Sequence, residues 1–451
     1  MISNTMTRKS PNQVAVSLAI VVSLVLLLIS KDSYTHDLFN KADSGWFFMC
    51  GKAWMSGLRP YVDFADSKGP LLWLIYGIGY LMSHHDFIGV FWLSCVAYSV
   101  TLYFHFLTAN LFLADRRKAF LAAGTMMLFY FFPVIHNEVR CEDFAIPWLS
   151  MALWHASCLI VGYGRHRLRR WTAMGMSLGA LLMMKWNLIL LPLAVMLVVA
   201  VATRNRLRKS VSTVVVAAVA GVAFIVLPFV AYFLLMGTWN DFIHEYFVNP
   251  LRITTVGVKP YYFTILMPLM IFPTVMLLRG RKVGKLLSLG GVAAVAVVVV
   301  VANLWAHDFR HADYGDFFTQ DNIARWQFYQ YEYVVAQADH PRIVSMGGYM
   351  GVGTCSEALP ACKYWARQSG ATPQMDSLQM DCCRKKEADF VLVHTDLQEA
   401  MEAMRRFGYY ETNLASLLYP FVLYSKRQPK LPPDEFHVTN GMVLMKRVSL
   451  K

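Results

Sequence analysis

The sequence predicts an all-α polytopic membrane bundle of nine spans, followed by a small extracytoplasmic α/β domain. Hydrophobic residues make up 56% of the 451 positions and charged residues 16%, whereas an ordinary soluble domain carries about 25% charged residues. Long apolar runs recur over the first two thirds of the chain, and basic clusters bound them. The composition after Trp305 is that of a globular domain. We therefore expect a bundle over residues 1–305 and a separate domain over residues 306–451.

Nine apolar runs are expected to cross the membrane as helices. The first run follows Arg8 and Lys9 and lacks a small-residue cleavage site, which favours a retained anchor over a removed signal peptide. The fifth and sixth runs are short for a hydrocarbon core of about 30 Å, so they either tilt little or cross where the protein thins the membrane. The predicted spans are residues 14–29, 87–113, 119–135, 144–162, 171–184, 188–202, 211–236, 261–278 and 286–305.

The apolar segment 71–82 is predicted to lie flat on the outer surface rather than to cross. A helix of this length covers about 18 Å at 1.5 Å per residue, which is too short to span. If the segment lies flat, the basic clusters fall on the inner side, as the positive-inside rule requires, and if it crosses they all fall outside. These clusters lie at 116–118, 165–170, 204–209 and 279–285. The N-terminus is therefore expected inside and the tail outside.

The net charge of +13 follows largely from those short inner loops. Basic residues beside membrane helices set orientation and contact lipid headgroups. The charge is therefore weak evidence for nucleic acid, and no nucleic-acid partner is expected.

The tail after Trp305 has the strand and helix patterns of a small α/β domain. We expect strands at 342–346, 389–394, 421–424 and 441–445, and helices at 321–338 and 396–407. An outer compartment permits disulfides, and a Cys355–Cys362 bond is a candidate, with one of the vicinal pair Cys382 and Cys383 able to bond elsewhere. A zinc site is the alternative, although no histidine lies at ligand spacing.

The first outer loop, residues 31–86, places Asp43, Asp63, Asp66 and Lys68 next to the membrane surface. Transfer of a group from a lipid phosphate needs a base that deprotonates the acceptor hydroxyl and a cation that holds the leaving phosphate. Each carboxylate taken alone is better explained as a solvated loop charge. Their concentration in one loop, which leads directly into the flat helix, favours a functional site.

This loop resembles the first-loop signature of the C-type (GT-C) glycosyltransferases, and most of all the bacterial branch related to the protein mannosyltransferases of glycosyltransferase family 39. The resemblance rests on DSGW at 43–46, GLRPYVDF at 57–64 and DSKGPLL at 66–72, and it extends loosely over the bundle. It implies a GT-C fold with juxtamembrane helices, a polyprenyl-phosphate sugar as donor, and a bacterial cytoplasmic membrane as location. A glycan, a lipid-linked glycan or a protein hydroxyl would be the acceptor.

By this resemblance Asp43 takes the position of the general base, and Lys68 helps to bind the donor phosphate. Asp66 would orient Lys68 or touch the sugar, and Asp63 and Tyr61 are further substrate-binding candidates. The protein mannosyltransferases carry an Asp-Glu pair where this chain has Asp43 followed by serine, which leaves the acceptor open. No resident cofactor is implied, and a divalent cation is left open.

Further candidates lie in the second outer loop and at helix ends. Glu142 precedes a Phe-x-x-Pro stretch and matches an acidic residue of the relatives, so it is a second catalytic candidate, with a helix N-terminal charge as the alternative. Lys185 lies among apolar residues at the end of the fifth span, where a lysine either has a function or snorkels to the interface. The remaining substrate-binding candidates are Glu138 in the second outer loop, and Arg252 and Lys259, for which simple headgroup contact is the alternative.

The sequence thus predicts a membrane glycosyltransferase that moves a sugar from a polyprenyl-phosphate donor by a single inverting displacement, with Asp43 as base. A transporter or flippase of a lipid-linked substrate is the first alternative. Such proteins show repeat symmetry and polar sites at the membrane midplane, whereas the polar residues here gather at the outer rim. The second alternative, an assembly subunit whose outer domain binds a partner, would not need an acidic first loop.

Overall fold

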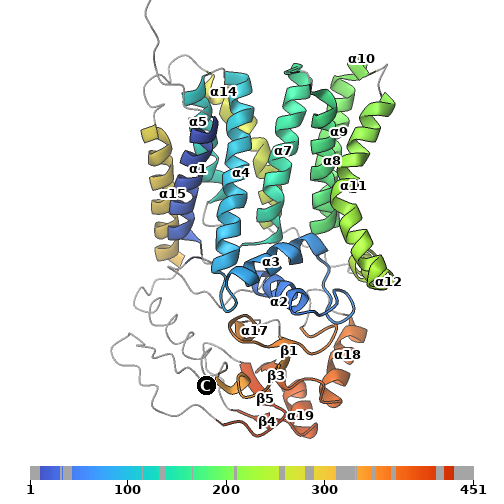
Figure 1. Cartoon of the computed structure of the whole chain (residues 1–451). Coiled ribbons are helices and arrows are strands. Elements are labelled where there is room, and N and C mark those ends of the chain that lie inside the picture. The colour runs from blue at the N-terminus through green and yellow to red at the C-terminus, as the bar shows by residue number, and fades with distance from the viewer. Residues whose placement is uncertain are drawn as a thin grey trace, which may run out of the picture.

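Figure 1 shows the computed structural model of the whole chain, in which a bundle of long helices stands above a smaller α/β unit. The structure describes residues 11–30, 33, 43–113, 115–131, 139–164, 166–207, 211–252, 260–279, 289–310, 331, 333–347, 351–366, 372–412 and 421–430. Within these residues the arrangement is mostly helical with one small sheet, as the apolar runs and the strand patterns of the tail predict.

The bundle consists of apolar helices that run side by side (Figure 1). Within the described residues, three helices are long and apolar enough to cross a membrane, namely α4 (Ile88–Leu113), α7 (Cys141–Val161) and α11 (Val211–Leu235). The other helices of the bundle are α1 (Pro11–Ile29), α5 (Arg116–Thr125), α6 (Met127–Tyr130), α8 (Arg167–Met184), η1 (Trp186–Ile189), α9 (Leu190–Ala202), α10 (Arg204–Leu207), η3 (Pro260–Met270), α14 (Ile271–Leu278) and α15 (Leu289–Arg310). The count of nine spans stays a prediction.

Three of the predicted spans are not single α-helices. The run 119–135 divides at Met126 into α5 and α6, the run 188–202 begins in the 3-10 helix η1, and the run 261–278 is 3-10 helix over its first half, η3. Apolar periodicity reports that a segment is buried in protein or lipid, but it does not report where the hydrogen-bond pattern changes.

Two short helices, α2 (Asp43–Met55) and α3 (Pro70–Met82), lie across one end of the bundle, between it and the α/β unit (Figure 1). Pro70 begins α3 at a position where the missing N–H costs nothing. The two helices touch through glycines, because a Cβ on Gly51 would lie 2.4 Å from the Gly77 nitrogen. The helix predicted over 71–82 is therefore present at one end of the bundle, and its place on the outer membrane surface stays a prediction.

Among the described residues, the α/β unit contains a five-stranded sheet of order β2-β1-β3-β5-β4. β1 (Arg342–Met346), β2 (Leu359–Pro360) and β3 (Phe390–His394) are parallel, whereas β5 (Phe421–Ser425) runs antiparallel to β3 and to β4 (Tyr410–Glu411). The helices of the unit are α17 (Gly351–Cys355), α18 (Pro373–Arg384) and α19 (Gln398–Arg406).

The two faces of the sheet pack against different partners, as the alternation of strand side chains requires. Val344 and Val391 face one way and share a core with residues of α18 and α19. Ile343 and Leu392 face the other way and share a core with Tyr61 and other residues of the first outer loop. The sheet is therefore attached to the loop that carries half of the candidate site residues.

The strands β1, β3 and β5 coincide within one residue with predicted strands, and α19 lies within the predicted helix 396–407. The predicted strand 441–445 lies outside the described residues, as do residues 321–330 and 332 of the predicted helix 321–338, while residues 331 and 333–335 of that segment are helical. The predicted Cys355–Cys362 disulfide is wrong for this structure, because the Cys362 thiol is free. Its neighbour is Cys382 on α18; their hydrogen bond, together with burial, raises the pKa of the Cys362 thiol.

We predict that Gly221→Val will destabilise the bundle, because α8 and α11 are in backbone contact there. A Cβ on Gly221 would lie 2.0 Å from the Thr172 carbonyl oxygen, and small residues of this kind let membrane helices approach closely. Overpacking typically costs about 1–3 kcal/mol, so the midpoint of thermal unfolding in detergent should fall by several degrees. Ala220→Val, at an exposed neighbouring position, is the matched control. Equal midpoints for both variants would contradict the predicted packing.

Candidate functional site

The candidate site lies where the first outer loop meets the ends of α7 and α8. The Gly69 N–H donates to the Met184 carbonyl oxygen at 2.7 Å. A Cβ on Gly69 would lie 2.0 Å from the Met183 carbonyl oxygen, so the two backbones are in direct contact and only glycine fits. Lys68 is the residue before Gly69, and Lys185 is the residue after Met184. The fold therefore brings the backbones that carry these two predicted residues close together.

Lys185 is paired with Glu142 at the start of α7. The Lys185 Nζ donates to Glu142 Oε1 at 2.7 Å, and the two side chains are 14% and 5% exposed. The Cys141 Sγ also lies 3.9 Å from the Met184 carbonyl oxygen, which shows how closely α7 and α8 approach here. A charge-assisted hydrogen bond in such surroundings fixes both side chains. Lys185 therefore does not snorkel freely to the interface.

Lys68 is paired with Asp66 more loosely. The Lys68 Nζ lies 4.0 Å from Asp66 Oδ2, with exposures of 22% and 7%. Asp66 Oδ1 accepts the Ser67 N–H at 2.6 Å, while Oδ2 is buried without a hydrogen-bond partner. The Lys68 Nζ also lies 5.5 Å from the centre of the Phe47 ring, within cation–π range. The lysine is thus the accessible member of this pair, and Asp66 lies behind it.

Asp43 is the first residue of α2, and its side chain is exposed. It precedes Phe47 by four residues, and residues with that separation lie on one face of a helix about 5–6 Å apart. Phe47 is the residue whose ring contacts Lys68. The helix therefore presents Asp43 on the face that carries the Lys68 contact.

Tyr61 supports Lys68 from within the core. Its side chain is fully buried, and its ring lies 4.5 Å from the Trp73 ring, centre to centre. The Tyr61 hydroxyl donates to the Lys68 carbonyl oxygen at 2.9 Å, and burial raises its pKa well above the usual range. The structure thus gives this predicted substrate-binding residue a role in holding the loop, out of reach of a substrate at the surface.

Asp63 closes a local turn with Arg59. Its Oδ2 accepts the Arg59 N–H at 2.7 Å, and its Oδ1 accepts from the guanidinium at 3.1 Å. Partial burial alone would raise the pKa of Asp63, but the hydrogen bonds and the charge of Arg59 outweigh burial, so this pKa is lowered. Asp63 is predicted to bind substrate, but its carboxylate is hydrogen-bonded to Arg59 within its own turn.

Three predicted substrate-binding residues are not placed by the structure. Glu138 and Lys259 lie outside the described residues, and Arg252 ends α13 (Asn249–Arg252) with a side chain that is not described. Within the described residues, no group of three or more His, Cys, Asp or Glu side chains is arranged to hold a metal ion.

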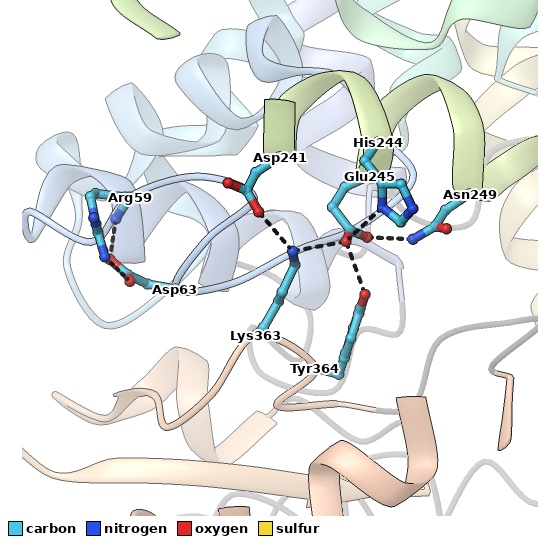
Figure 2. A network of polar contacts seen from close by, with 8 residues as sticks. All are labelled: Arg59, Asp63, Asp241, His244, Glu245, Asn249, Lys363 and Tyr364. Carbon is cyan, nitrogen blue, oxygen red and sulfur yellow. Dashed lines mark hydrogen bonds and ion pairs between the residues drawn. The ribbon is translucent and has the colours of Figure 1, made fainter. Parts of the chain in front are cut away.

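Sequence reasoning missed a polar network between the α/β unit and the segment formed by α12 (Trp239–Ile243) and η2 (His244–Val248) (Figure 2). Its centre is Glu245, a buried carboxylate that pairs with Lys363 at 2.8 Å. Sequence reasoning also missed Lys52, a fully buried lysine of α2 that donates to the carbonyl oxygens of Gly353 and Ser356. For Lys52 the one available signal was a lysine inside an apolar helix.

The chain is similar to known proteins in sequence and in fold. The model of the dolichyl-phosphate-mannose-protein mannosyltransferase family matches residues 67–232. The apo structure of ArnT from Cupriavidus metallidurans matches with a TM-score of 0.55 and 14% identity, covering 91% of this chain and 97% of that one. The structure of that ArnT bound to undecaprenyl phosphate matches with a TM-score of 0.60 and 13% identity over the same shares of the two chains. Among curated proteins no match was found.

We predict that removing one member of the Glu142–Lys185 pair will destabilise the protein more than removing both. Glu142→Gln leaves the Lys185 charge buried without its carboxylate, which typically costs about 3–5 kcal/mol, whereas apolar replacement of a whole buried pair is often neutral. Thermal unfolding of Glu142→Gln, Lys185→Met and the double variant Glu142→Leu/Lys185→Met measures this. The double variant should be closest to wild type in stability, and additive losses would contradict the pairing.

Proposed function

Because this chain has the fold of the C-type glycosyltransferases, we propose that it is a membrane glycosyltransferase that takes a sugar from a polyprenyl-phosphate donor at the outer face of the membrane. The observation that carries the proposal is the placement of Lys68 and Lys185 on either side of the Gly69–Met184 contact. Two cations at the end of a membrane bundle suit a phosphate that stays attached to its lipid. The ArnT structure with undecaprenyl phosphate shows that a protein of this fold binds such a lipid.

In the proposed reaction, Asp43 accepts the proton of the acceptor hydroxyl as the hydroxyl oxygen attacks the anomeric carbon. The bond from that carbon to the phosphate oxygen breaks, and polyprenyl phosphate leaves with the bonding electrons. Lys68, the accessible cation, compensates the charge that develops on the leaving phosphate. Asp66 orients Lys68, and Glu142 orients Lys185. The single displacement inverts the configuration of the sugar.

The acceptor would be a glycan, a lipid-linked glycan or a protein hydroxyl on the same side of the membrane. Ser44 stands where the protein mannosyltransferases carry a glutamate, which weakens the case for a protein. A bacterial cytoplasmic membrane, with α2, α3 and the α/β unit on its outer side and the N-terminus inside, fits the basic inner loops.

We predict that Asp43→Asn abolishes transfer and leaves the protein folded. Asparagine preserves the size of the side chain but cannot accept the proton, and general base catalysis is typically worth about 10²–10⁴ in rate. The measurement is release of polyprenyl phosphate from a polyprenyl-phosphate sugar by the purified protein, with envelope glycans as acceptor.

Asp339→Asn is the matched control, because that carboxylate is 97% exposed and lies in the α/β unit. It should keep the wild-type rate. Full activity of Asp43→Asn would remove the proposed base. A wild-type protein that moves the lipid between leaflets and releases no polyprenyl phosphate would support the transporter alternative instead.

A further inference from the structure

Three consecutive residues of the α/β unit touch the loop that carries Asp66 and Lys68; we call residues 363–365 the brace. The Ala65 N–H, next to Asp66, donates to the Lys363 carbonyl oxygen at 2.9 Å. Tyr364 packs against Ala65 in a small apolar cluster. The Trp365 ring is buried with its centre 5.6 Å from that of Trp46 on α2. The brace therefore contacts both parts of the first outer loop that hold proposed site residues, α2 with Asp43 and the segment with Asp66 and Lys68.

The side chains of the brace are fixed on the opposite side by Glu245 (Figure 2). The Lys363 Nζ lies 2.8 Å from Glu245 Oε1 and 3.3 Å from Asp241 Oδ1. The Tyr364 hydroxyl donates to Glu245 Oε1 at 3.0 Å, and the Asn249 amide donates to Oε2 at 2.7 Å. Glu245 is 5% exposed, so removing one donor leaves a buried carboxylate under-compensated.

The segment that carries Glu245 reaches the same loop from its other end. The Tyr246 hydroxyl donates to the Leu182 carbonyl oxygen at 2.6 Å, and it lies 2.7 Å from where a Cβ on Gly69 would be. The loop is thus held at Ala65 by the brace and at Gly69 by Tyr246 and α8. Asp66 and Lys68 lie between these two fixed points.

We propose that Lys363, Tyr364 and Glu245 are positioning residues for the transfer reaction, which set the place of Lys68 relative to Lys185 without touching the donor. The inference rests on the proposed function. If these residues only stabilised the fold, replacing them would lower stability and leave the kinetics of the folded enzyme unchanged. A positioning role raises the KM for the donor and lowers kcat, while the KM for the acceptor stays constant, because Lys363 and Tyr364 hold the loop at Ala65, beside the segment that binds the phosphate.

The decisive variant is Lys363→Met, which keeps the length of the side chain and removes its charge. Misplacement of about 1 Å can cost about 10²-fold in rate, so we expect kcat/KM for the donor to fall ten- to a hundredfold with an unchanged acceptor KM. Lys363→Arg should restore most of the activity. Hydrogen–deuterium exchange over residues 61–69 should be faster in Lys363→Met than in wild type. If Lys363→Met fails to fold, Tyr364→Phe takes its place, because it deletes one hydroxyl only. It should change kcat/KM for the donor and the exchange rate in the same direction, but by less.

Arg405→Met is the matched control, since it breaks the Arg405–Glu411 pair at 2.9 Å, on the surface of the same α/β unit. It should leave donor kinetics and exchange within twofold of wild type. Wild-type donor kinetics in folded Lys363→Met and Tyr364→Phe would overturn the positioning role even if stability falls. Failure of the proposed function would appear differently, as a wild-type protein that releases no polyprenyl phosphate.

Discussion

The contact between the Gly69 backbone and the end of α8 fixes the geometry on which the rest of the site depends. A hydrogen bond of 2.7 Å to the Met184 carbonyl oxygen, at a position where a Cβ would meet the Met183 oxygen at 2.0 Å, leaves no room for a side chain. The residues that flank this contact in sequence are the two lysines of the site. Like charges held near one another repel, and each lysine has a carboxylate beside it, Asp66 or Glu142.

These two ion pairs differ in length and in burial, which suits them to different roles. The Lys185–Glu142 pair is short and nearly buried, whereas the Lys68–Asp66 pair is longer and its lysine is the most exposed of the four side chains. A tight buried pair resists rearrangement, while a loosely paired cation can exchange its partner for a phosphate oxygen at little cost. The brace and Tyr246 then confine the loop that carries this cation, so its freedom is limited to the side chain.

Sequence reasoning succeeded where the information is local. The strands β1 and β3 were predictable because buried parallel strands are continuous apolar runs, and α3 was predictable as an apolar segment too short to cross a membrane. Asp66 and Lys68 are two residues apart, so their association followed from the motif. Glu142 and Lys185 are 43 residues apart and could be named only singly. Glu245 and Tyr364 are 119 residues apart, and loop charges have no period that would indicate a partner. The break between α5 and α6 at Met126 and the contact between Cys362 and Cys382 likewise depend on tertiary packing.

Photolabelling tests the central claim most directly. A polyprenyl-phosphate sugar that carries a photoreactive group beside the phosphate would be irradiated with the purified protein, and the labelled peptides identified by mass spectrometry. If Lys68 and Lys185 share one phosphate site, peptides containing each of them should be labelled together, and excess unlabelled polyprenyl phosphate should remove both labels. Competable labelling confined to other parts of the chain, with neither lysine peptide modified, would contradict the account.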